Sequence, residues 1–207
     1  MSQLVGCAWP DGVVLAADRR VVLEQEDGQQ IHSLRKLYPL GAQAAMATAG
    51  AAVGIGVSRT LSQVFRRRSA AEFEEIEPYV VQVFRREYEA FVHRGHQWFQ
   101  DHPEAHRRSY LLLAGRDSDG RCRLAFYASE DHGHPHRGVR VKGVVTAPRR
   151  LGLETLLYQE LQQPTRDRLL EAVMQGMHRI RERDDAVDGP FDLAVLERSG
   201  FVFWTSG

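Results

Sequence analysis

Three histidines stand close together in the middle of the chain, at His132, His134 and His136. Imidazole nitrogens at such spacing can bind a divalent metal ion. The run lies in a loop rich in Gly and Pro without a neighbouring cysteine, so a polar surface loop is the better interpretation. The two cysteines, Cys7 and Cys122, do not have the spacing of a metal motif and are interpreted as ordinary core residues. The sequence therefore predicts neither a metal ion nor another cofactor.

Charge and hydropathy exclude several classes of partner. The chain has 27 Lys and Arg against 27 Asp and Glu, a balance that favours neither nucleic acid nor an anionic membrane. Its opening lacks the basic and apolar regions of a secretory signal, and its apolar runs are too short to span a bilayer. Two cysteines without a disulfide pattern fit a reducing compartment. We therefore expect a cytoplasmic protein that contacts neither membrane nor nucleic acid.

The first fifty residues have the pattern of antiparallel strands separated by turn residues. A polar loop is expected from Glu24 to Gln30, around Gly28. The predicted strands are Leu4 to Ala8, Val13 to Asp18, Lys36 to Leu40 and Ala44 to Thr48.

Helical and strand patterns alternate in the rest of the chain. Such alternation favours an α+β fold in which two sheets pack together and helices cover both outer faces. No linker or repeat divides residues 1–207, so we expect a single domain. The predicted helices are Ala51 to Phe65, Ala70 to Gln100, Leu151 to Leu161 and Arg166 to Arg183, and the predicted strands are Ser109 to Gly115, Cys122 to Ala128, Val139 to Val145, Phe191 to Glu197 and Phe201 to Ser206.

Three segments resemble the β-type subunits of proteasomes. They are VGCAWPDGVVLAADRR (Val5 to Arg20), KLYPLGAQAAMATAG (Lys36 to Gly50) and RDDAVDGPFDLAVL (Arg183 to Leu196). The third segment is also similar to Anbu, an ancestral-type bacterial proteasome relative. The resemblance implies the four-layer αββα sandwich of N-terminal-nucleophile hydrolases and a threonine-peptidase type of chemistry.

The resemblance also assigns roles to individual residues. In the family, the first residue of the mature chain is the nucleophile, and Ser2 falls at that position because Asp18 follows it by sixteen residues. Lys36 falls at the family's lysine position, fourteen residues before Gly50, whose backbone N–H matches the oxyanion donor. A competing register would place Ser33 at the lysine position, but Lys36 needs no insertion before the glycine.

These roles follow a consistent chemistry. A serine hydroxyl needs a nearby base, and the α-amine of an N-terminal serine, with a reference pKa of about 7.7–8.0, can serve as one. Lysine beside the hydroxyl lowers the hydroxyl pKa, and an aspartate holds that lysine charged and oriented. Removal of Met1 would free the amine of Ser2, since methionine is normally trimmed before a residue as small as serine.

The chain also departs from the family's pattern. Asp185 matches the family's late aspartate, but Asp188 stands where a serine or threonine is usual. The family's Gly-Ser-Gly is replaced by the segment Val144 to Pro148. These departures, together with a retained Met1, would fit a catalytically inactive ring or scaffold subunit. A third alternative is an amidohydrolase of the same superfamily that acts on a small amide.

The resemblance implies partners as well. A peptidase of this family assembles into a homo-oligomeric ring or double ring around an enclosed chamber, takes peptide or unfolded-protein substrates, and often works with an ATP-dependent unfoldase. The small residues from Ala51 to Ser58 are interpreted as a face that could pack against a neighbouring subunit. The chain itself contains no phosphate-binding Gly-x-x-x-x-Gly-Lys motif.

Overall fold

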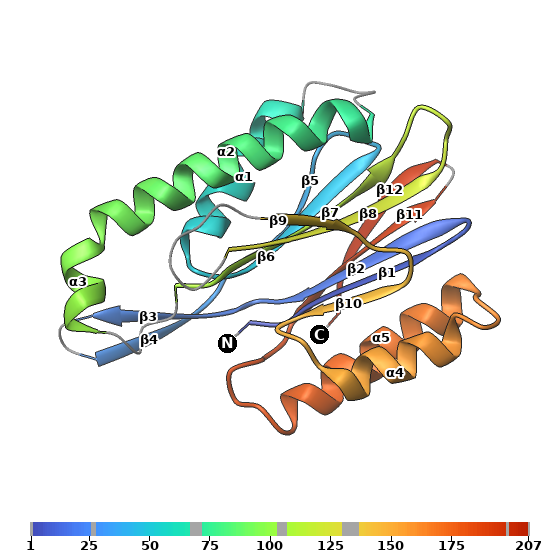
Figure 1. Cartoon of the computed structure of the whole chain (residues 1–207). Coiled ribbons are helices and arrows are strands. Elements are labelled where there is room, and N and C mark those ends of the chain that lie inside the picture. The colour runs from blue at the N-terminus through green and yellow to red at the C-terminus, as the bar shows by residue number, and fades with distance from the viewer. Residues whose placement is uncertain are drawn as a thin grey trace.

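The computed structural model describes residues 2–25, 28–66, 72–102, 107–129, 137–197 and 199–206. Within these residues the chain forms five helices and three antiparallel sheets, which confirms the predicted α+β class (Figure 1). Two of the sheets have five strands each, and the third is a two-stranded ribbon.

The first five-stranded sheet has the strand order β10-β1-β2-β11-β12. Its central strand, β2, is buried along its whole length because both of its faces are covered, as the short apolar run before Asp18 predicted. The five strands are β1 (Leu4–Trp9), β2 (Gly12–Asp18), β10 (Val144–Ala147), β11 (Phe191–Glu197) and β12 (Gly200–Ser206).

The second five-stranded sheet has the order β5-β6-β7-β8-β9. Small residues dominate β6, whose sequence AAMATAG allows the two sheets to approach closely. The five strands are β5 (Leu37–Pro39), β6 (Ala44–Gly50), β7 (Ser109–Arg116), β8 (Cys122–Ala128) and β9 (Arg137–Arg140).

Helices cover the outward face of each five-stranded sheet. The predicted helix from Ala70 to Gln100 is divided in two at Gly95, which follows one long helix and precedes a short one. Residues 70 and 71 lie outside the described part. The helices are α1 (Val53–Phe65), α2 (Phe73–Arg94), α3 (His96–Asp101), α4 (Leu151–Glu160) and α5 (Arg166–Arg181).

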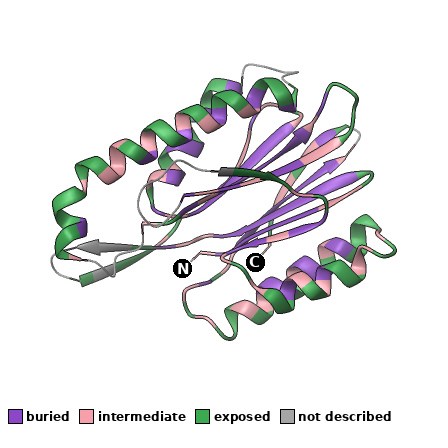
Figure 2. Ribbon diagram, viewed as in Figure 1, coloured by how far each residue is buried: buried purple, intermediate pink, exposed green. Residues whose placement is uncertain are grey.

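Three apolar clusters show how the layers pack. One lies between the first sheet and helices α4 and α5, and another lies between the second sheet and helices α1 and α2. The third lies between the two sheets and includes Leu15, Ala47 and Leu112. Figure 2 shows the buried residues concentrated in the two sheets and on the inward sides of these helices. Burial of this central layer fixes the two sheets against each other.

Two expectations about the strands were wrong. The segment predicted as one strand from Val139 to Val145 contributes to β9 in one sheet and β10 in the other, because the chain crosses between the sheets at residues 141–143. The stretch expected as a polar loop, Glu24 to Gln30, is part of the ribbon formed by β3 (Arg20–Gln25) and β4 (Gly28–Ser33), with residues 26 and 27 not described. Backbone pairing between the two strands overrode their polar composition.

No helix in the described part of the chain is long and apolar enough to cross a membrane.

Candidate active site

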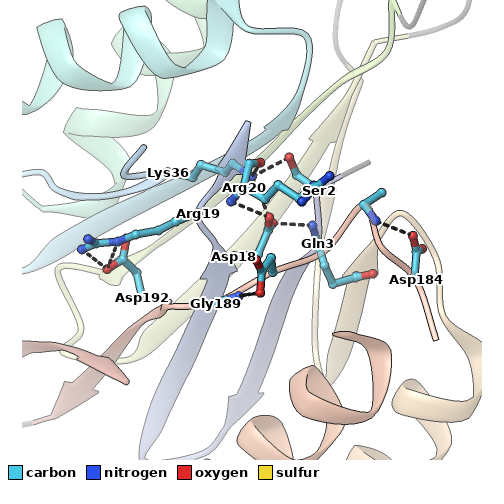
Figure 3. Close-up of polar contacts among 11 residues, drawn as sticks. Ser2, Gln3, Asp18, Arg19, Arg20, Lys36, Asp184, Gly189 and Asp192 are labelled. Carbon is cyan, nitrogen blue, oxygen red and sulfur yellow. Dashed lines mark hydrogen bonds and ion pairs between the residues drawn. The ribbon is translucent and has the colours of Figure 1, made fainter. Parts of the chain in front are cut away.

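Lys36 is the centre of a buried polar cluster (Figure 3). Its ammonium donates hydrogen bonds to Ser2 Oγ at 2.6 Å, to Asp18 Oδ2 at 2.9 Å and to the carbonyl oxygen of Arg20 at 2.5 Å. The side chain is only 1% exposed, yet all three of its N–H donors have acceptors. A buried lysine in this chain is therefore compatible with folding because none of its polar hydrogens is left unpaired.

Asp18 is fully buried at the end of β2, with several donors around its carboxylate. The backbone N–H of Gln3 donates to Oδ1 at 2.7 Å, and the backbone N–H of Arg20 donates to Oδ2 at 3.1 Å. The first of these bonds holds the chain segment that carries Ser2 against β2. Asp18 thus orients the Lys36 ammonium and positions the residue next to Ser2.

The elements around the cluster explain why these three side chains meet. Ser2 lies two residues before β1, which pairs with β2, so the start of β1 and the end of β2 are adjacent. Lys36 directly precedes β5, and its carbonyl oxygen accepts a hydrogen bond from the Thr48 N–H on β6. The cluster therefore bridges the two stacked sheets, with Ser2 and Asp18 from one and Lys36 from the edge of the other.

Burial changes the proton affinities of both charged groups. Burial lowers the pKa of Lys36, while the negative charges of Asp18 and Asp192 oppose this shift. Burial also raises the pKa of Asp18, which its ion pair with Lys36 and its backbone hydrogen bonds oppose. A lysine with a lowered pKa can give up and take back a proton more readily near neutral pH than an exposed lysine can.

Of the two positions that competed for the lysine role, the structure places Lys36 beside Ser2 and Asp18. Ser33 is an exposed residue at the end of β4.

Gly50 ends β6 and is paired with Ser109 on β7. Its φ of +85° is in the left-handed region, and a Cβ there would lie 2.0 Å from the carbonyl oxygen of Arg108. Only glycine fits this backbone conformation.

The late acidic residues are arranged differently from the expectation. Asp185 and Asp188 are exposed, and no described hydrogen bond or ion pair joins either of them to Ser2, Asp18 or Lys36. The Asp188 carboxylate instead accepts a hydrogen bond from the adjacent Gly189 N–H.

The acidic residue that is connected to the N-terminal segment is Asp184. It forms an ion pair with Arg150, whose Nε donates to Gln3 Oε1 at 3.2 Å. Asp184 Oδ1 also accepts a hydrogen bond from the backbone N–H of Ala186, at 3.0 Å.

A second ion pair, between a partly exposed arginine and a buried aspartate, lies beside the first and was missed in the sequence. Asp192 on β11 is 1% exposed and accepts hydrogen bonds from Arg19, which follows Asp18 directly. Thr205 donates a further hydrogen bond to the same carboxylate at 2.9 Å. The signal in the sequence is a single aspartate within the otherwise apolar strand FDLAVL, together with a consecutive pair of arginines after Asp18. This pair anchors the end of β2, where Asp18 lies.

The three histidines considered as metal ligands lie outside the described residues. Among the residues that are described, no group of three or more His, Cys, Asp or Glu side chains is arranged to hold a metal ion.

No protein-family model matches the chain, and no curated protein is significantly similar to it in sequence.

Proposed function

We propose that the chain is an N-terminal-nucleophile peptidase of the proteasome type, in which Ser2 becomes the nucleophile after removal of Met1. The observation that carries the proposal is the hydrogen bond from a buried lysine ammonium to the hydroxyl of Ser2. A buried ion pair whose lysine also contacts a serine beside the chain's N-terminal end is costly to build for stability alone.

In this mechanism the free α-amine of Ser2 accepts the proton of the Ser2 hydroxyl as Oγ attacks the substrate's carbonyl carbon. The Lys36 ammonium stabilises negative charge developing on Oγ, and Asp18 keeps that ammonium charged and oriented. The Gly50 N–H would stabilise the oxyanion, a type of contact worth about 2.7–4 kcal/mol in other hydrolases. The C–N bond then breaks, the protonated α-amine returns its proton to the leaving amine, and water hydrolyses the ester on Ser2.

The arrangement of the layers supports the proposal. A helix layer, two stacked antiparallel sheets and a second helix layer follow one another, which is the αββα order that the resemblance implies for N-terminal-nucleophile hydrolases. By the same resemblance we propose a cytoplasmic ring or double ring that acts on peptides or unfolded proteins, with an ATP-dependent unfoldase as its partner.

The experiment is an intact-mass measurement before and after exposure to a peptide epoxyketone, which requires a hydroxyl nucleophile and an adjacent free amine. We expect loss of Met1 and addition of one probe molecule per chain. Ser2→Ala should abolish the adduct, while the matched variant Ser33→Ala, at an exposed serine, should retain it.

The other outcomes separate the alternatives. Retention of Met1 without an adduct would contradict the proposal and favour an inactive ring subunit. An adduct that persists in Ser2→Ala would mean that another residue is the nucleophile. Labelling of Ser2 together with turnover of small amides, but not of peptides, would favour an amidohydrolase.

A further inference from the structure

The side chain of Gln3, the residue that follows Ser2, is fully buried, and each of its polar atoms has a partner. Its Nε2 donates to the carbonyl oxygens of Leu4 at 2.9 Å and of Pro148 at 3.1 Å, and its Oε1 accepts a hydrogen bond from Arg150 Nε at 3.2 Å. A buried amide is costly unless its hydrogen bonds are made. These contacts explain how a polar side chain is tolerated beside the apolar strand β1.

Arg150 connects Gln3 to the loop between α5 and β11. Its guanidinium forms an ion pair with Asp184 in addition to the hydrogen bond to Gln3. Its backbone N–H donates to Thr146 Oγ1 at 2.7 Å, which fixes Arg150 at the junction between β10 and α4. One guanidinium therefore joins three segments that are far apart in the sequence, next to the start of β1.

Gln3 is held on its other side by the Asp18 carboxylate, to which its backbone N–H donates at 2.7 Å. Figure 3 shows Gln3 between Asp18 and Asp184. Ser2 is joined to this doubly held residue by a single peptide bond, so the position of its Oγ, 2.6 Å from the Lys36 ammonium, depends on Gln3. A displacement of about 1 Å in a reacting group can lower a rate about a hundredfold.

The charges around the start of the chain include two ion pairs, Lys36 with Asp18 and Arg150 with Asp184. Burial acts to raise the pKa of Asp184, but a backbone hydrogen bond and the contact with Arg150 lower it overall, so this carboxylate is ionised at neutral pH. Loss of either member of the second pair would leave the charge of the other uncompensated beside the N-terminal segment.

Further charged groups on the neighbouring elements are unchanged by substitution of Arg150 or Asp184. They are Arg20 on β3, Arg149 and Glu154 around the start of α4, and the exposed Arg183, Asp185 and Asp188. An electrostatic difference between variants of the second ion pair is therefore due to that pair.

We propose that Gln3 and Arg150 are positioning residues of the Ser2 site. They clamp the start of β1 so that the Ser2 hydroxyl stays against Lys36, and they place the Arg150–Asp184 ion pair beside the α-amine that removal of Met1 would free. This assignment rests on the proposed function, because it concerns the same nucleophile and the same base. It adds two residues that act through the position of Ser2 and not through contact with its hydroxyl.

The test uses chains that begin at Ser2, released from a cleavable N-terminal fusion and verified by intact mass. The rate of labelling by the peptide epoxyketone is measured as a function of pH. Because the α-amine must lose its proton to act as the base, the wild-type rate should rise with pH through the amine pKa, which is about 7.7–8.0 in unperturbed chains. Gln3→Met, with a side chain of similar volume, should lower the rate by about tenfold or more. The midpoint of its pH profile should not move, because both charges of the ion pair remain.

Arg150→Met and Asp184→Asn should move that midpoint in opposite directions. Without Arg150, the unpaired Asp184 carboxylate favours the protonated amine, so the midpoint rises by about half a pH unit. Without the Asp184 charge, the unpaired Arg150 cation disfavours the protonated amine, so the midpoint falls by a similar amount. Arg150→Lys keeps the charge but not the forked donor, so it should restore the midpoint and only part of the rate.

Arg149→Met is the matched control. Arg149 is the neighbouring arginine, its side chain is 74% exposed, and its ion pair is with Glu154. Its replacement should leave the labelling rate within about twofold of the wild type and the midpoint in place. If Arg150→Met does not fold, the lower midpoint in Asp184→Asn and the slower labelling in Gln3→Met still test the proposal.

A direct titration of the α-amine separates this inference from the proposed function. Competitive acetylation over a pH series, read from the mass of the N-terminal peptide, gives the pKa of the amine without any turnover. Opposite shifts in Arg150→Met and Asp184→Asn, in a protein that the epoxyketone does not label, would reject the hydrolase and support the place of the ion pair beside the amine. Labelling of Ser2 with the wild-type rate and midpoint in Gln3→Met and Arg150→Met would overturn the clamp and leave the hydrolase standing. Slower labelling in Arg150→Met and Asp184→Asn without opposite shifts would also overturn it, because loss of packing alone has that result.

Discussion

At the scale of single residues, Lys36 is the most constrained side chain in the cluster. The chain contains only two lysines, and the other, Lys142, is exposed. Every other cationic side chain apart from histidine is an arginine, whose forked guanidinium could not replace the compact ammonium that contacts Ser2, Asp18 and a carbonyl oxygen at once. The rarity of lysine was therefore a usable signal in the sequence for a special role of this position.

Replacement of Lys36 by Met should leave the Asp18 carboxylate buried without its cation. Because an uncompensated buried charge is costly, we expect the free energy of unfolding to fall by about 3–5 kcal/mol near neutral pH. Lys142→Met should change it by less than about 0.5 kcal/mol. Urea denaturation measures the free energy of unfolding of both variants.

The pH dependence of the destabilisation by Lys36→Met tests whether the unpaired charge of Asp18 causes it. Without Lys36, the pKa of folded Asp18 rises further above its value in the unfolded chain, which is about 3.9. The folded variant then holds a proton that the unfolded chain releases, so the stability of the variant falls as the pH rises between the two pKa values. The destabilisation should be larger at about pH 8 than at about pH 4.5. An equal loss at both pH values would point to lost packing rather than to the charge of Asp18.

At the scale of the elements, the junction between β6 and α1 fixes the backbone conformation around Gly50, on one side of the candidate site. Gly54 and Ser58 on α1 are buried, and Ser58 donates a hydrogen bond to the Gly54 carbonyl oxygen at 2.7 Å. A Cβ at Gly54 would come within 3.1 Å of Thr48. Gly54 and Ser58 therefore pack inside the chain, whereas Ala52 and Gly56 on the same segment are exposed, so the predicted contact of this segment with a neighbouring subunit stays a prediction.

Gly50→Ala and Gly56→Ala form a matched pair for this junction. Alanine at Gly50 must adopt a positive φ and displace the Arg108 carbonyl, so we expect a loss of stability of about 2 kcal/mol or more. Gly56 is exposed on α1, and a methyl group there would meet no other atom within 4 Å, so alanine should raise stability by roughly 1 kcal/mol. Thermal unfolding measures both, and a Gly50→Ala variant as stable as the wild type would contradict the backbone assignment.

At the scale of the whole molecule, the chain places the candidate site at one end of the stacked sheets. Figure 1 shows the N-terminal end of the chain beside β10, with the β3–β4 ribbon extending away from the two five-stranded sheets. Val22 and Ile31 form a cross-strand pair on this ribbon and are 40% and 60% exposed.

The proposed ring makes a prediction about mass. Light scattering after size exclusion should give a multiple of the 23.5 kDa chain mass that is stable on dilution. Ser2→Ala should assemble to the same mass, because the hydroxyl contributes to chemistry and not to the subunit contacts that we propose. A 23.5 kDa species at all concentrations would contradict the ring and would leave the chemistry at Ser2 to be judged by labelling alone.

The sequence by itself determined the α+β class and most of the strands and helices. Cys122–Ala128 and Phe191–Glu197 have the predicted bounds, because short apolar runs between turn residues reflect local burial and backbone preference. The resemblance that assigned roles to Ser2, Asp18 and Lys36 also identified three side chains that meet in the structure. Whether they act as a catalytic site stays a prediction.

Only the tertiary structure decided which other residues join them. The connection of Asp184 to Gln3 through Arg150 and the Arg19–Asp192 pair both depend on strand register and on contacts between distant segments. The ribbon of β3 and β4 depends on backbone pairing that polar side chains do not reveal. A shift of one residue turns a side chain to the opposite face of a strand, so local patterns cannot determine such partners.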